Sequence, residues 1–257
     1  GLEPTEKILE KDVLQKAQPV ELSKSVTLLP APDEDEDEHD HDKDHKDDKD
    51  HKDDKDDHNK AQKEDKHEHE HEHGEFDPHV WLSPKKAKLL VEKITTQLSE
   101  AFPEKASAFK TNAQAYLEKL SQLDNEYTTA LKDAKQKNFV TQHTAFRYLA
   151  TDYGLNQVGI AGISPEAEPS PARLAELTKY IKENEIRYIY FEENASEKIA
   201  KTLATETGVV LEVLNPLESL TKEEMDKGDN YISVMKENLQ ALLKTTTVVG
   251  KEIKPEH

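Results

Sequence analysis

The chain has 257 residues and a formal net charge of −19, with 35% charged and 34% hydrophobic residues. It contains no cysteine, which excludes disulfides, thiolate metal sites and cysteine nucleophiles, and leaves histidine and the carboxylates as strong metal ligands. A mean hydropathy of −0.91 without a long apolar stretch argues against a membrane-spanning helix. The acidic balance argues against a nucleic-acid partner and favours cations.

Most of the charge lies in one low-complexity segment, Asp33–His73. It holds 21 acidic residues against 8 lysines, a net charge of −13, together with 9 of the 12 histidines. Its only hydrophobic residue is Ala61, so the segment cannot offset the entropy lost on ordering and is predicted to be a mobile loop. The rest of the chain is about 40% hydrophobic, which is enough to bury a core.

The first ordered elements flank this loop. Before it, a helical pattern is followed by an extended stretch over 18–30, whose Val and Leu residues are expected to be buried. After it, Ser83 is the predicted N-cap of a helix that begins at Pro84 and runs to about residue 99. A second apolar pattern over 104–135 predicts a helix of about 45 Å, longer than a compact domain needs, which indicates a strut.

The remaining sequence alternates between strand and helix periodicity. The predicted strands are 138–143, 157–161, 187–192 and 209–214. The predicted helices are 145–153, 170–184, 195–207 and 230–243. Such alternation predicts an α/β fold with a mostly parallel four-stranded sheet, whose ligand sites lie beyond the carboxyl ends of the strands.

Three side chains are candidates for a metal site, two of them at that sheet edge. His79 lies just before a helix, His143 ends the first strand of the sheet, and Glu218 follows the last strand. Two imidazoles and one carboxylate suit a tetrahedral Zn²⁺ with one position left for water or another ligand. Taken singly, each histidine is more often a helix cap or a hydrogen-bonded structural residue, and Glu218 more often an ordinary loop residue.

Other residues form a second rank of candidates. Trp81 is most simply a core residue. The second-ranked candidates for metal ligands or residues of the crevice rim are Glu166, Glu168 and the pair Glu192-Glu193. Histidines of the acidic loop will bind Zn²⁺ or Ni²⁺ weakly whatever their purpose. These auxiliary candidates are His39, His41, His45, His51, His58, His67, His69, His71 and His73.

Several motifs together resemble one protein family, and the resemblance covers nearly the whole chain. They are the His-rich acidic loop, Asp77-Pro-His-Val-Trp-Leu-Ser-Pro84, Phe139-Val-Thr-Gln-His143, Ser164-Pro-Glu-Ala-Glu-Pro-Ser170, Tyr190-Phe-Glu-Glu-Asn-Ala-Ser196 and Leu214-Asn-Pro-Leu-Glu-Ser-Leu220. The sequence is similar to the zinc-binding solute-binding proteins of ABC importers, the ZnuA-like cluster A-I family. The resemblance implies two α/β lobes joined by a long rigid helix, with zinc held between them by His79, His143, Glu218 and a further histidine.

The resemblance also implies a map of the chain. Its segments would be the end of the first lobe (1–32), the loop (33–74), a metal-site segment with its helix (75–102), the linking helix (103–137), the second lobe (138–249) and a linker (250–257). The family's first histidine ligand has no counterpart here, so we expect an amino-terminally truncated chain. We also expect a lipid anchor in the missing part, an ABC permease as partner, a monomer and an extracellular location.

Two other functions fit the same residues. A zinc-dependent hydrolase could use two histidines, a glutamate and water, although no His-Glu-x-x-His motif or nearby general base stands out beside His79, His143 and Glu218. Alternatively, the His-rich loop is the whole function, and the protein is a metal buffer or a surface interaction protein.

Overall fold

The computed structural model describes residues 17, 19–31, 76–163, 169–192 and 198–249. Within these ranges, no helix is long and apolar enough to cross a membrane. The strands are β1 (Asn138–Thr141), β2 (Asn156–Gly159), β3 (Tyr188–Phe191) and β4 (Val210–Val213). The α-helices are α3 (Pro84–Ala101), α4 (Ala106–Leu131), α5 (Arg147–Tyr153), α6 (Pro171–Glu183), α7 (Lys198–Thr207), α8 (Lys222–Lys227) and α9 (Tyr231–Thr246). Short 3₁₀ helices are η1 (Ser23–Ser25), η2 (Val80–Leu82) and η3 (Pro103–Lys105).

The four strands form one parallel sheet in the order β2-β1-β3-β4, as the alternation of the sequence predicts. Strand β1 is central and buried along its whole length. Because all four strands run the same way, their carboxyl ends meet at one edge, and the loops that follow β1, β3 and β4 lie close together.

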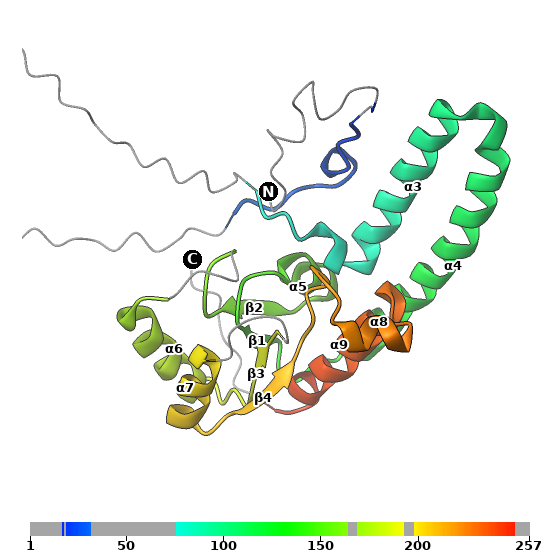
Figure 1. Ribbon diagram of the computed structural model, residues 1–257. Coiled ribbons are helices and arrows are strands. Elements are labelled where there is room, and N and C mark those ends of the chain that lie inside the picture. The colour runs from blue at the N-terminus through cyan, green and yellow to red at the C-terminus, as the bar shows by residue number, and fades with distance from the viewer. Residues whose placement is uncertain (1–16, 18, 32–75, 164–168, 193–197, 250–257) are drawn as a thin grey trace, which may run out of the picture. The chain divides into compact units, whose positions relative to one another are not determined.

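Helices cover both faces of the sheet, and side chains of β1 and β3 alternate between two cores (Figure 1). Phe139 and Tyr190 point into a core shared with α4, α5 and α9. Val140 and Ile189 point into the other core, shared with α6 and α7. Burial on both faces is the reason why β3 is a continuous apolar run, Tyr-Ile-Tyr-Phe, rather than an alternating one.

The long helix differs in detail from its prediction. The turn at Pro103–Lys105 is a 3₁₀ helix, and α4 has 26 residues, so it is about 39 Å long rather than 45 Å. Its carboxyl-terminal half buries Leu120, Leu123, Tyr127 and Leu131, and the last three belong to the core shared with α5 and α9. Its amino-terminal half packs against α3 in a helical hairpin (Figure 1). Its role as a strut between lobes stays a prediction.

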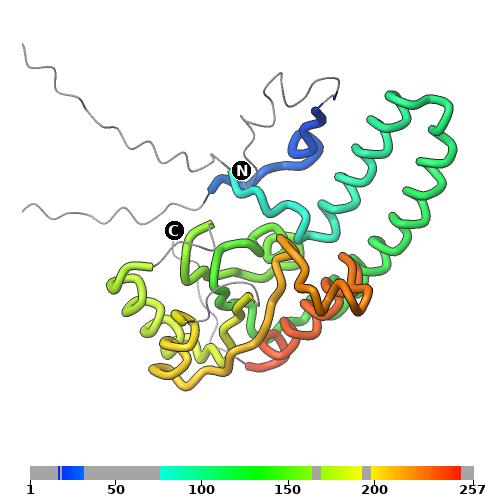
Figure 2. The backbone as a smooth tube through the Cα atoms, viewed as in Figure 1, coloured from blue at the N-terminus to red at the C-terminus, as the bar shows by residue number. Residues whose placement is uncertain are grey.

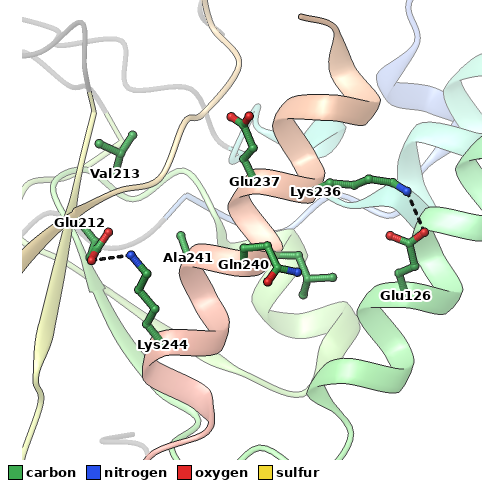
Figure 3. A pocket seen from close by; sticks show the side chains of 9 residues that line it. Glu126, Glu212, Val213, Lys236, Glu237, Gln240, Ala241 and Lys244 are labelled. Carbon is green, nitrogen blue, oxygen red and sulfur yellow. Dashed lines mark hydrogen bonds and ion pairs between the residues drawn. The ribbon is translucent and has the colours of Figure 1, made fainter.

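Helix α9 packs between α4 and the sheet, where it contacts β1 and β4. The Tyr127 hydroxyl donates to the Met235 carbonyl at 2.6 Å, and both groups are buried. At the surface, Lys236 pairs with Glu126 and Lys244 with Glu212 across a shallow pocket (Figure 3). Exposed pairs of this kind contribute at most about 1 kcal/mol, so the buried contacts of Tyr127 fix the helix more firmly.

The segment before the acidic loop is not the buried strand that the sequence suggests. Residues 19–31 contain the short helix η1 and a single antiparallel bridge, Pro30 to Phe76, and none of them is buried. The bridge pairs residue 30 with residue 76, and the Asp77 amide donates to the Leu29 carbonyl at 2.9 Å. The segment before the acidic loop, in blue, therefore runs beside the start of the cyan segment that leads to α3 (Figure 2). Pairing with one residue rather than a sheet leaves the Val and Leu side chains of this segment partly exposed.

Gly159, at the end of β2, must lack a side chain. A Cβ there would lie 2.1 Å from Thr144 Oγ1 and 2.7 Å from the Ala161 carbonyl oxygen. Thr144 in turn donates from its amide to the Gly162 carbonyl at 2.8 Å and from its hydroxyl to Ala161 at 3.0 Å. The close approach therefore fixes the turn that follows His143.

We predict that Gly159→Ala lowers the free energy of unfolding, near the upper end of the range of about 1–3 kcal/mol, because the clash is with backbone and a packed side chain. Urea denaturation followed by circular dichroism measures the loss. Gly208→Ala is the control, since φ is +76° there and nothing lies within 4 Å of the new Cβ. It should cost only the backbone strain, about 1–2 kcal/mol. A Gly159→Ala loss no larger than the control would contradict the prediction.

Candidate metal centre

His79 is oriented by a carboxylate two residues before it. Asp77 Oδ1 accepts a hydrogen bond from the His79 amide at 3.0 Å and lies 2.8 Å from its ring Nδ1. Both side chains are fully buried. Although His79 occupies the N-cap position of η2, its side chain makes no capping hydrogen bond. The ring is therefore anchored through Nδ1 and presents Nε2 to the neighbouring loops.

His143 lies two residues beyond β1, fully buried. Its backbone carbonyl accepts from the Thr141 hydroxyl at 2.7 Å and from Gln157 Nε2 at 3.0 Å. Its ring Nδ1 is paired with Glu192 Oε1. Its ring Nε2 is buried but has no hydrogen-bond partner. This nitrogen is therefore available to bind a metal ion.

Glu218 follows β4 on a loop that is clamped from two sides. Asn238 of α9 accepts from the Asn215 amide at 2.9 Å and donates to the Asn215 carbonyl at 2.8 Å. From the other side, the Trp81 indole donates to the Pro216 carbonyl at 3.0 Å. Leu217 has a positive φ of 55°, an unfavourable conformation for leucine, which these contacts hold in place.

The three elements bring three donor atoms together. One nitrogen of His79, one of His143 and a carboxylate oxygen of Glu218 all lie within 4.8 Å of one another. Glu218 Oε1 is 3.2 Å from His79 Nε2 and 3.4 Å from His143 Nε2. Ligands held about 2.0–2.1 Å from a tetrahedral zinc ion lie about 3.4 Å apart, so these two separations suit such an ion.

The charges of the three groups are strongly coupled. Burial lowers the pKa of His143, but its pairing with Glu192 and the nearby Glu218 carboxylate outweigh this effect and raise the pKa to about 9. Burial likewise lowers the pKa of His79, and hydrogen bonds with Asp77 and Glu218 raise it above the ordinary value. The neighbouring imidazoles of His143 and His79 lower the pKa of Glu218 to about 2. The site is therefore built to hold positive charge.

The candidates named from the sequence have different outcomes. The structure brings His79, His143 and Glu218 together, whereas Glu192 lies behind His143, on its Nδ1 side. Trp81 packs against the main core, as expected, but it also links the His79 segment to the Glu218 loop. The remaining candidates, Glu166, Glu168, Glu193 and the nine histidines of the acidic loop, lie outside the described residues.

Some supporting residues could not be singled out from the sequence. Asp77 has a weak local signal, since an Asp-x-His spacing allows the carboxylate to reach the imidazole. Gln157 and Asn238 have none, because each reaches a backbone group that is distant in the chain. Gln157 and Asn238 reach these backbone groups only because β2 pairs with β1 and α9 packs against the sheet.

Zinc-binding and zinc-uptake proteins are similar to this chain over about two thirds of its length or more. The chain is 58% identical over 200 residues to the zinc-binding protein AdcA of Streptococcus pyogenes, covering 78% of this chain and 39% of that protein. It is 54% identical over 167 residues to the high-affinity zinc uptake system protein ZnuA of Bacillus subtilis, covering 65% of this chain and 52% of that protein. The Zn(II)-bound ZnuA-like domain of Streptococcus pneumoniae AdcA matches it with a TM-score of 0.60 and 63% identity, covering 68% of this chain and 65% of that one.

The chain thus spans about two fifths of the length of the streptococcal relative and about half of the Bacillus one. Residues 1–245 match the family described as zinc-uptake complex component A, periplasmic. This match covers nearly the whole chain and confirms the resemblance that the motifs suggest: the chain belongs to the zinc-uptake complex component A, or ZnuA, family.

Proposed function

We propose that His79, His143 and Glu218 bind Zn²⁺ and that the protein is the zinc-capturing receptor of an ABC importer. The observation that carries this proposal is the meeting of two Nε2 atoms and a carboxylate oxygen at separations that suit tetrahedral zinc. Membership of a zinc-uptake family and the similarity to a Zn(II)-bound structure support it. Two imidazoles against one carboxylate favour zinc over harder cations such as Mn²⁺.

In this role the ion is cargo, and the protein performs no covalent chemistry. The donors bind zinc outside the cell, and a membrane permease receives it. The group found among the described residues supplies three donors, which leaves one tetrahedral position for a fourth ligand or water. We propose a monomer without enzymatic activity that is lipid-anchored at the extracellular face of the membrane. The name of a relative in Streptococcus pneumoniae, zinc-binding lipoprotein AdcA, supports the anchor.

The acidic loop adds a second part to this proposal. Its nine histidines would raise the local zinc concentration, and His73 precedes His79 by only six residues. The bridge between Pro30 and Phe76 places the residues that flank this segment next to each other. Ions held weakly by its histidines would then have a short path along the chain to His79.

Loss of a ligand should abolish tight zinc binding. We expect His143→Ala and the nearly isosteric Glu218→Gln to weaken zinc binding by at least about 100-fold. Replacing a residue that only hydrogen-bonds to a metal ligand already lowers metal affinity about 10–100-fold. Competition with a chromophoric chelator measures the affinity, and circular dichroism confirms that each variant is folded. The control is Glu126→Gln, which removes a carboxylate from a surface ion pair only. Unchanged affinity in both site variants would refute the ligand assignment.

Zinc affinity should depend on pH over an unusual range. Zinc needs neutral imidazoles, and the pKa of His143 is raised to about 9, so protons compete with the ion up to that pH. We expect the apparent affinity to keep rising between pH 7.5 and 8.5, by about tenfold per pH unit for each proton displaced. The same chelator competition, with a variant lacking 33–73 to remove the loop histidines, measures this. A plateau above pH 7, typical of ordinary imidazoles, would contradict it.

Removing the loop should lower zinc uptake when zinc is scarce. Deletion of 33–73 is expected to reduce the number of weakly bound zinc ions while leaving the tight site intact, because residues 30 and 76 are already adjacent. The matched control retains the loop but carries glutamine in place of its nine histidines, so it separates the imidazoles from the acidic charge. Zinc stoichiometry and uptake at limiting zinc are the measurements. Unchanged uptake would exclude the scavenging role, and loss of all tight binding would favour the metal-buffer alternative.

A further inference from the structure

Glu192 is a buried carboxylate that is not among the three donors. It follows β3 directly, has 6% of its surface exposed, and pairs through Oε1 with His143 Nδ1. Resting on the proposed function, we propose that Glu192 is a positioning residue for zinc binding. It fixes the proton of His143 on Nδ1, so that Nε2 is free for the metal, and it supplies the negative charge that completes neutralisation of a divalent cation.

The first part of this role follows from the chemistry of imidazole. A neutral histidine carries one N–H, and the nitrogen that carries it cannot bind a metal. A carboxylate that accepts a hydrogen bond from Nδ1–H holds the proton there and leaves the lone pair on Nε2. In His143 this Nε2 is the atom without a hydrogen-bond partner, 3.4 Å from Glu218 Oε1. The pairing therefore selects the nitrogen that faces the donors.

Sheet topology explains why Glu192 can reach this position. Strands β1 and β3 are neighbours, with Thr141 opposite Tyr190, and the Gln142 amide donates to the Tyr190 carbonyl at 2.9 Å. Glu192 is two residues beyond Tyr190, as His143 is two beyond Thr141, so both side chains leave the sheet edge side by side. His79 is different, because Asp77 lies on its own segment.

The second part of the role follows from the charges around the site. With both imidazoles neutral, the charged groups paired with one another or with the two imidazoles, among the residues that the structure describes, are Asp77, Glu192, Glu218 and the Arg147 guanidinium, whose Nη1 is 3.9 Å from Asp77 Oδ2. Arg147 offsets the charge of Asp77. Glu192 and Glu218 then carry the two negative charges that balance Zn²⁺, one as a ligand and the other through His143.

Two substitutions of Glu192 in the full chain separate orientation from charge. Glu192→Gln keeps a carbonyl that can accept from Nδ1–H but removes the charge, whereas Glu192→Leu removes both. We expect zinc affinity to fall about 10-fold in the first variant and about 100-fold in the second, within the range known for outer partners of metal ligands. Glu126→Gln is the matched control and should stay within about twofold of the unmodified protein. Chelator competition measures the affinities.

A second measurement reports orientation without any metal. Long-range ¹H–¹⁵N spectra of the zinc-free protein, above the pKa of His143, should show the proton on Nδ1 in the unmodified protein and in Glu192→Gln. In Glu192→Leu the two tautomers should mix. Because the glutamine variant is nearly isosteric, it decides the question if the leucine variant fails to fold. Affinities within twofold of the unmodified protein in the folded variants, or a proton on Nε2 in the unmodified protein, would overturn the proposal.

This failure can be told apart from a failure of the proposed function. If His143→Ala leaves tight zinc binding unchanged, the ligand assignment itself is wrong. If His143→Ala abolishes tight binding while both Glu192 variants retain it, the ligands are right and Glu192 has no positioning role.

Discussion

The candidate site depends on one repeated interaction, a buried carboxylate behind each imidazole. Asp77 and Glu192 each pair with an Nδ1 atom, so both rings turn Nε2 towards Glu218. Rings anchored on one nitrogen lose little freedom when the other binds an ion, which reduces the entropy cost of binding. Without these carboxylates, two buried imidazoles would have no fixed orientation.

The ends of three strands, β1, β3 and β4, position His143, Glu192 and Glu218. His143 and Glu192 leave adjacent parallel strands, and Glu218 follows the edge strand β4. The Glu218 loop needs further support, because Leu217 has an unfavourable positive φ. Asn238 and the Trp81 indole provide it through buried or partly buried hydrogen bonds to backbone groups. The rigid core beneath the sheet edge thus determines where the flexible carboxylate side chain points.

The electrostatics of the site match a cation as cargo. In the absence of metal, the raised pKa of His143 and the lowered pKa of Glu218 show that the same groups stabilise bound protons. In the proposed function, an incoming divalent ion would replace those protons, so that capture and protonation would compete for one set of atoms. A receptor that must later release its ion benefits from such a competition, because proton uptake can offset the loss of metal contacts.

The sequence by itself determined the α/β class, the parallel sheet and most element boundaries, because strand and helix periodicities are local and the cores on both sides of the sheet are strongly apolar. It also singled out His143 and Glu218, since residues after parallel strands share one edge, and His79, since it is the other histidine outside the acidic loop and the tail. It did not place η1 or α8, nor the positions of Glu192 and Asn238. Those depend on which strand lies beside which and on how α9 packs, and these long-range contacts leave no periodic signal in the chain. Only the tertiary structure decided that Glu192 stands behind His143 rather than among the donors.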